Sequence, residues 1–128
     1  MPAYTPEEVP LLFAEGLSAG DLEALMTLYE TEAIFLAQPA EPPVKGTEAI
    51  RAALQGFLAI QPTFTLQVRQ IFETGDLALS FAGWTLTGTG PDSEPIELSG
   101  QTSDVLRRQP DGTWRFAIDN PFGSAHGF

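Results

Sequence analysis

The spacing of apolar residues changes once along this chain, at Pro62, from a helical period to a strand period. Before Pro62, apolar residues recur three or four positions apart, which predicts helices at residues 6–18, 21–30 and 47–59. After it, apolar and polar residues alternate, which predicts strands at residues 63–72, 77–87, 96–108 and 113–120, with a further short strand at 33–36. We therefore predict an α+β fold in which three N-terminal helices pack on one face of an antiparallel sheet.

Charge and composition exclude several classes of function. The 128 residues include 17 acidic and 6 basic ones, and the formal net charge of -11 disfavours nucleic acid and anionic membrane surfaces as partners. Cysteine is absent and there is one histidine, which excludes disulfides, thiol nucleophiles and a multi-histidine metal site within one chain. Carboxylate chemistry or ligand binding remains, and we expect neither a metal nor an organic cofactor.

Length and hydropathy indicate one soluble domain. We place it at residues 1–128, with a core at about 5–123 and a tail at 124–128. No apolar run reaches the roughly 18 residues that span a bilayer, and the first residues contain no basic segment. We expect a cytoplasmic protein without a membrane partner.

The last hairpin allows its pairing to be predicted. The turn Pro110-Asp111-Gly112 fits a three-residue loop, which would place Gln109 opposite Thr113. In that register Leu106 faces Phe116 and Asp104 faces Ile118, all on one side of the sheet. The opposite side would carry Asp119 between Arg107 and Arg115, which predicts an ion pair at the surface or at an interface.

Asp104 is the candidate functional residue, because this register points its side chain toward the apolar side of the sheet. We expect it beside Phe81, Leu106 and Phe116, with a raised pKa, since burial disfavours the charged form of a carboxyl group. Two interpretations stay open. Asp104 is either an acid or base in a pocket, or a structural group that is hydrogen-bonded to the helix layer.

Residues 77–87 carry apolar side chains at both odd and even positions, so both faces of this strand need cover. The helices can cover one face, and we predict a homodimer through the other, outer face. The rings of Phe64, Phe72, Phe81 and Trp84 form either part of the core or the wall of a pocket for an apolar ligand.

Three local motifs resemble a known family. Residues 19–22 (AGDL), 46–51 (GTEAIR) and 111–115 (DGTWR) are similar to those of the nuclear transport factor 2-like superfamily. Nearer still are its SnoaL-like, ketosteroid-isomerase-like branch and, within that branch, small bacterial proteins of the YybH kind. The resemblance implies a cystatin-like, cone-shaped and strongly curved sheet wrapped on the helices, a pocket at the open end, and a homodimer through the sheet.

The same resemblance bears on activity. Asp104 falls where ketosteroid isomerase keeps its protonated aspartic acid, but Phe13 replaces the oxyanion tyrosine and residues 36–39 (LAQP) contain no acid to act as base. In the limonene-epoxide-hydrolase pattern Thr102 replaces the arginine, and Asp119 lies near the second aspartate.

We therefore retain two hypotheses. The first is binding of a small hydrophobic or polycyclic carbonyl-type molecule. The alternative is a cofactor-free isomerase, cyclase or hydrolase in which Asp104 is the acid or base and Tyr29, Gln38 and Trp84 position the substrate. The predicted pocket is lined by Phe13, Tyr29, Gln38, Phe57, Phe81, Trp84, Leu106 and Phe116.

Overall fold

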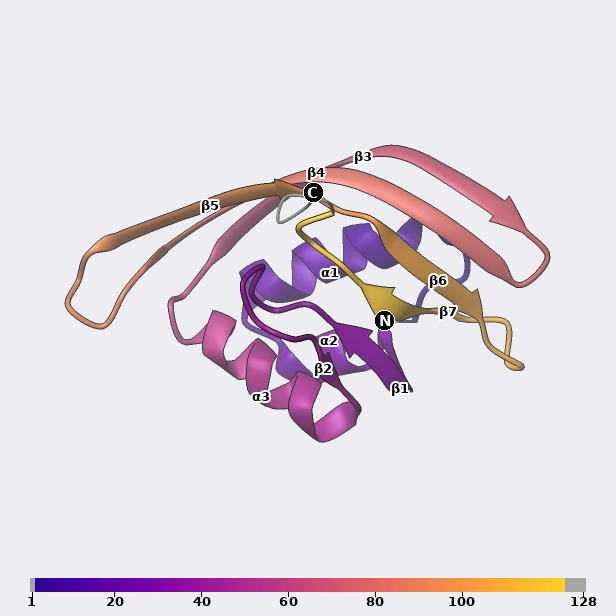
Figure 1. Cartoon of the computed structure of the whole chain (residues 1–128), viewed down its shortest axis with the longest axis horizontal. Coiled ribbons are helices and arrows are strands. Elements are labelled where there is room, and N and C mark those ends of the chain that lie inside the picture. The colour runs from indigo at the N-terminus through magenta and orange to yellow at the C-terminus, as the bar shows by residue number, and fades with distance from the viewer. Residues whose placement is uncertain (1, 124–128) are drawn as a thin grey trace.

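A computed structural model describes residues 2–123 and contains three helices on one side of a curved, unclosed sheet (Figure 1). The tail predicted at residues 124–128 lies outside the described residues. The helices are α1 (Glu8–Ala19), α2 (Leu22–Met26) and α3 (Thr47–Leu58), so the three predicted helices are confirmed. Among the described residues, none of these helices combines the length and apolarity needed to cross a membrane.

The second helix is shorter than predicted. Asp21 caps its start by accepting a hydrogen bond from the backbone N–H of Ala24, but the helix ends at Met26 rather than near residue 30. The backbone is then drawn into the sheet, where the Leu28 carbonyl accepts from the N–H of Phe116. Tyr29 therefore begins a strand and does not extend the apolar face of the helix.

Within residues 2–123, seven strands form the sheet: β1 (Tyr29–Phe35), β2 (Val44–Lys45), β3 (Thr63–Thr74), β4 (Leu77–Thr89), β5 (Pro95–Gln101), β6 (Asp104–Arg108) and β7 (Trp114–Asp119). Their order is β2-β1-β7-β6-β4-β3, with β5 paired to the second half of β4. The predicted antiparallel meander is confirmed for β3 to β7, but β1 runs parallel to β7. Strand β1 thus extends the sheet beyond β7, the last strand of the meander, and the sequence did not predict this pairing.

The predicted strand 96–108 is divided at Thr102 and Ser103. Both parts keep one register on β4, since Gly83 pairs with Gln101 and Ser80 pairs with Asp104. At the break, the Thr102 hydroxyl accepts from the backbone N–H of Ala82 at 2.9 Å. This break lies at the start of β6, beside the candidate residue Asp104.

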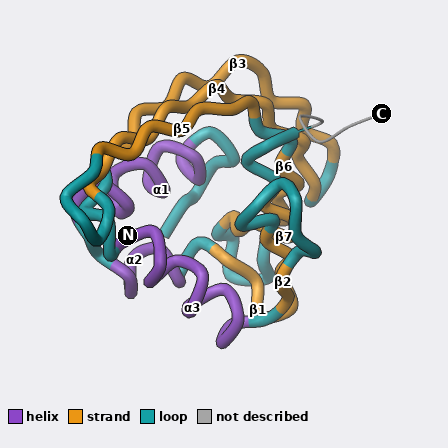
Figure 2. The backbone as a smooth tube through the Cα atoms, turned by 60° about the vertical axis from the view of Figure 1, so that its left-hand side comes forward, coloured by secondary structure: helices purple, strands orange, loops and turns teal. Residues whose placement is uncertain are grey.

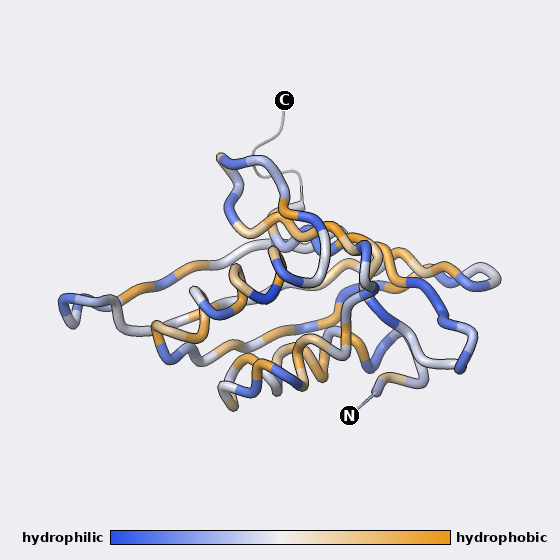
Figure 3. The backbone as a smooth tube through the Cα atoms, turned by 90° about the horizontal axis from the view of Figure 1, so that it is seen from below, coloured by the Kyte–Doolittle hydropathy of each residue, from blue (hydrophilic) through white to orange (hydrophobic). Residues whose placement is uncertain are grey.

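The core lies between the helices and the inner face of the sheet (Figure 2). Apolar stretches recur along the helices and strands, whereas the tip of the β4–β5 hairpin is hydrophilic (Figure 3). Along β4 the even-numbered residues point inward and are buried, and the odd-numbered ones point outward. Phe81 therefore lies on the outer face, packed edge-on against Phe72 with ring centroids 6.3 Å apart, and the prediction that it flanks Asp104 is wrong.

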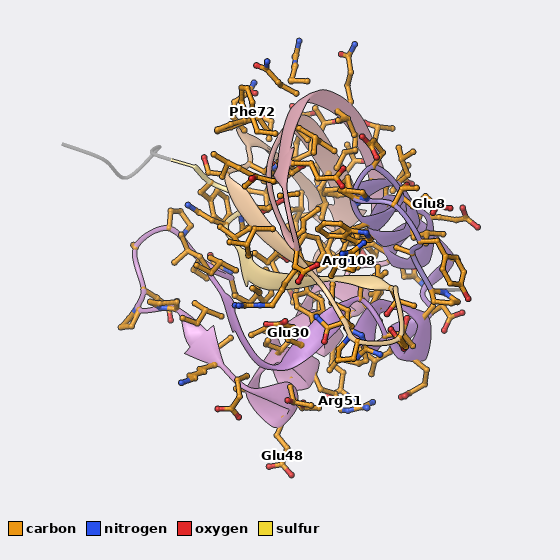
Figure 4. All side chains as sticks on the ribbon, turned by 90° about the vertical axis from the view of Figure 1, so that its right-hand side faces the viewer. Glu8, Glu30, Glu48, Arg51, Phe72 and Arg108 are labelled. Atoms are coloured by element: carbon orange, nitrogen blue, oxygen red, sulfur yellow. The ribbon has the colours of Figure 1, made fainter. Side chains whose placement is uncertain are left out.

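The outer face carries a continuous apolar row. Phe72 pairs with Leu79, Leu79 with Val105, and Val105 with Ile118, so the row crosses β3, β4, β6 and β7. Phe72 is 52% exposed and projects from the outer side of the sheet (Figure 4). We refer to Phe72, Leu79, Val105 and Ile118 as the outer apolar row. The expectation that both faces of residues 77–87 present apolar side chains is confirmed.

Candidate functional site

A β-bulge in β7 places a second carboxyl group in the interior. Leu106 pairs with Phe116 as predicted, but the next pair is Val105 with Ile118, which leaves Ala117 as an extra residue. A bulge exchanges the two faces of the strand beyond it. Ile118 consequently faces outward and Asp119 faces inward, with only 4% of its surface exposed.

Two sequence predictions are corrected by this bulge. Asp119 does not lie at the surface between Arg107 and Arg115, because it is buried beside Asp104. Ile118 does not face Asp104, because the register has shifted by one residue. Asp104 itself is 3% exposed and lies on the inner side of the sheet, as the turn geometry predicted.

The two aspartates form a hydrogen-bonded carboxyl pair, and both line the same cavity. The backbone N–H of Asn120 donates to Oδ1 of Asp104 at 2.8 Å. The hydroxyl of Tyr29, at the start of β1, donates to Oδ2 of Asp119 in a very short hydrogen bond. Each carboxyl group is therefore fixed by a neighbour from a different part of the sheet.

Burial is the main cause of the raised pKa values of these two carboxyl groups. It raises the pKa of Asp104 well above its ordinary value, and the charge of Asp119 adds to this effect, while the Asn120 N–H opposes it. Burial also raises the pKa of Asp119 to about 6, against the lowering effect of hydrogen bonds from Tyr29 and Asp104. The two carboxyl groups therefore titrate as a coupled pair in which Asp104 holds its proton more tightly than Asp119 does and donates it to Asp119.

Tyr29 remains a neutral donor in this arrangement. Its pKa is raised well above the ordinary value, first by burial and then by the charge of Asp119. Among residues 2–123, no lysine, arginine or histidine lines the cavity to compensate the carboxylate. Among the described residues, aromatic rings and hydrogen bonds therefore surround the buried carboxyl pair.

The cavity beside the pair is small and mainly aromatic. Its volume is about 40 Å³, which holds one or a few waters, whereas typical ligand pockets measure roughly 300–1,000 Å³. A ligand of more than a few atoms must therefore displace side chains from the wall. The lining consists of Pro10, Phe13, Leu17, Phe35, Phe57, Phe64, Leu66, Trp84, Leu86, Thr102, Asp104, Phe116, Asp119, Pro121 and Phe122.

Trp84 is the most firmly held part of the wall. Its indole N–H donates to the carbonyl of Pro121 at 2.6 Å, and its ring stacks on Phe64 with centroids 5.5 Å apart. Gly100, which pairs with Trp84 across the sheet, lies close to the indole ring, since a Cβ there would come within 2.9 Å of it. Stacking, close packing and one polar contact leave this side chain little freedom.

The structure brings together only part of the predicted pocket. Asp104, Phe13, Phe57, Trp84 and Phe116 line the cavity. Tyr29 does not line the cavity but donates a hydrogen bond to Asp119, which does. Leu106 is fully buried in the core and does not line the cavity either.

Two other predicted pocket residues lie elsewhere: Gln38 lines a surface groove beside α3, and Phe81 is on the outer face. Asp119 was missed as a pocket residue, and its proximity to the second aspartate of the limonene-epoxide-hydrolase pattern was the one sequence signal for it. Phe64, which the sequence placed either in the core or in a pocket wall, also lines the cavity, and Phe35 and Phe122 line it without having been predicted to do so.

Comparison with protein families assigns the chain. The SnoaL-like domain matches residues 12–120, and the chain belongs to this family. No protein of curated function matches the sequence.

Several solved structures share the fold. A conserved protein from Planctomyces limnophilus is 22% identical, with 88% of each chain covered and a TM-score of 0.80. A ketosteroid isomerase-like protein from Erwinia carotovora atroseptica is 16% identical, with 88% of each chain covered and a TM-score of 0.73. An NTF2-like protein with a cystatin-like fold from Novosphingobium aromaticivorans is 19% identical over 88% of this chain and 75% of that chain, with a TM-score of 0.73. These similarities support the predicted NTF2-like, cystatin-like fold.

Proposed function

We propose that the cavity binds a small, mainly apolar carbonyl compound, with its oxygen at the Asp104–Asp119 pair. The observation that carries this proposal is a buried carboxyl pair beside an aromatic cavity, where burial favours the protonated form of Asp104. A neutral Asp104 can donate a hydrogen bond to a carbonyl oxygen, which an ionised carboxylate cannot do. The aromatic and aliphatic lining would bury the rest of the molecule.

The cavity volume restricts the size of this ligand. At about 40 Å³, the cavity has no room for a polycyclic compound unless several rings of the wall move. A small carbonyl head group is the better match to the cavity as it stands. The polycyclic ligand stays a prediction that requires a wider form of the site.

Recognition of the carbonyl oxygen can be tested with two ligands of similar shape, 2-butanone and 2-methyl-1-butene. We expect the ketone to bind about fivefold more tightly, because one net hydrogen bond contributes about 1 kcal/mol. NMR titration of the wild type would measure both affinities. Asp104→Leu should abolish the preference, and Asp92→Asn, at an exposed position, is the control that should retain it. Equal affinities in the wild type would contradict the proposal.

A second candidate function is acid–base catalysis, and Asp119 is the observation that favours it. The sequence offered an acid but no base, whereas Asp119, with a pKa of about 6, lies beside Asp104 in the structure. Asp104 would transfer its proton to the carbonyl oxygen while Asp119 removes one from the adjacent carbon, giving an enol. Return of the protons in the reverse sense would exchange the α-hydrogens without a cofactor. In a β,γ-unsaturated ketone, return of the carbon-bound proton to the γ-carbon of the dienol would shift the double bond.

Deuterium exchange tests this second function. In D₂O, wild-type protein should speed the exchange of the α-hydrogens of 2-butanone, as followed by NMR. Asp119→Asn should stop this catalysis while 2-butanone still binds, because Asp104 remains as donor. Exchange at the same rate in Asp119→Asn would exclude Asp119 as the base.

We further propose that two copies pair through the outer apolar row. Leu79 and Ile118 are each 39% exposed, and the row lies on the side of the sheet that the helices do not cover. Burying such side chains against a second copy would remove apolar surface from water. Membership of the YybH kind, a single domain over residues 1–128 and a cytoplasmic location stay predictions.

A further inference from the structure

A surface groove, called here the α3 groove, is lined by residues of α3, residues 37–38 and β5, and it shares Phe57 with the cavity. It has a volume of about 430 Å³, roughly ten times that of the cavity. Gln38 is the one polar side chain among the residues that line it. These residues are Ala37, Gln38, Ala52, Ala53, Gly56, Phe57, Ile60, Ile96 and Leu98.

Phe57 belongs to both spaces. It lines the cavity together with Phe35, whose ring centroid is 6.2 Å away, and it also lines the outer groove. The side chain is half-buried near the end of α3. The neighbouring Gly56 borders open space, since a Cβ at this position would have no other atom within 4 Å. One aromatic ring, flanked by a gap, thus stands between the groove and the cavity.

We propose that the α3 groove is the outer half of the ligand site, and that it takes the linear apolar chain of a ketone whose carbonyl group lies at the carboxyl pair. This inference rests on the proposed function. It explains how a cavity too small for a whole ligand can still offer polar groups that suit a carbonyl oxygen. Phe57 must rotate aside for the chain to pass, and the methylenes then lie along Ala52, Ala53 and Leu98.

The groove chemistry defines the ligand further. Small alanine side chains and Gly56 on one wall, with Ile96 and Leu98 on the other, suit an unbranched alkyl chain rather than a bulky ring system. Gln38, at the edge of this groove, is placed to meet a polar group at the distal end of a longer chain. Its role would therefore be at the outer end of the site and not at the carboxyl pair.

A series of methyl ketones from 2-butanone to 2-decanone tests the groove. In the wild type, each added methylene should raise the affinity about fourfold, the factor that corresponds to about 0.8 kcal/mol per buried CH₂. Gly56→Leu and Ala52→Leu each place a larger side chain in the groove and should stop this rise beyond the shortest ketones. Gln55→Leu adds the same side chain at an exposed position of α3 outside the groove lining, and it should leave the rise unchanged.

These variants should fold, because leucine is a better helix former than glycine by roughly 0.8 kcal/mol and close to alanine. If the affinity of long ketones rises equally in all four proteins, the groove proposal is overturned while the proposed function stands. If wild-type protein does not prefer 2-butanone to 2-methyl-1-butene, the proposed function itself fails. The short-ligand pair and the chain-length series therefore separate the two failures.

Discussion

Replacing Asp104 by asparagine should change how the stability of the protein depends on pH. The asparagine oxygen can still accept from the N–H of Asn120, and its amide can still donate to Asp119 as the protonated acid does. The substitution therefore keeps the hydrogen bonds of the neutral state. It removes only the ability of this side chain to ionise.

The magnitude follows from proton counting. Because the pKa of Asp104 is raised well above its ordinary value, the folded wild type keeps a proton on this group at pH values where the unfolded chain, with a carboxyl pKa of about 3.9, has lost it. The folded state then binds one more proton, so the free energy of unfolding should fall by about 1.4 kcal/mol per pH unit as pH rises, until Asp104 ionises. Asp119 also has a raised pKa, so it lowers the free energy of unfolding in the same way between about pH 4 and its pKa of about 6. This second decline should occur in both the wild type and Asp104→Asn.

Urea unfolding at pH 6, 7 and 8 would measure the effect. If Asp104 keeps its proton throughout, the wild type should lose about 2.7 kcal/mol relative to Asp104→Asn between pH 6 and 8. Asp92→Asn, which alters an exposed carboxyl group of the β4–β5 hairpin, should follow the wild type. Parallel curves for wild type and Asp104→Asn would refute the assignment of the proton to Asp104.

Three further perturbations test other parts of the structure. Tyr29→Phe removes a hydrogen bond that lowers the pKa of Asp119, so that pKa should rise above about 6, and stability at pH 7 should fall by about 2 kcal/mol in urea unfolding. Gly100→Ala would place a Cβ 2.9 Å from the Trp84 ring, and thermal melts should show a loss of about 1–3 kcal/mol, whereas an unchanged melting temperature would contradict the packing. Leu79→Lys puts a charge in the outer apolar row, and light scattering should show a monomer where the wild type is a dimer; a wild-type monomer would exclude that interface.

The regular elements were predictable because their residues follow simple periods. The apolar face of α3 and the alternation along β4 both depend on spacing alone, and the structure confirms them. The end of α2 was not predictable in this way. Tyr29 fits the helical spacing, but pairing of the backbone with β7 is a contact between distant parts of the chain and decides its conformation.

The candidate site was likewise predictable only where local sequence decides the geometry. The turn at residues 110–112 fixed the pairing near it, so Leu106 faces Phe116 as predicted. Asp104 faces inward because it lies on the same strand. The bulge at Ala117 leaves no clear signature in the local sequence, and every residue beyond it changes face, which is why Asp119 was predicted on the wrong side of the sheet.

The shared proton at the carboxyl pair is best tested by a ¹³C NMR titration of the side-chain carboxyl groups of Asp104 and Asp119. At pH 7 we expect Asp104 to show the chemical shift of a protonated acid and Asp119 that of a carboxylate, with Asp119 titrating near pH 6. Titration of both groups near the ordinary aspartate value of about 3.9 would show that no proton is held at neutral pH, and would contradict the proposed donor to a carbonyl oxygen.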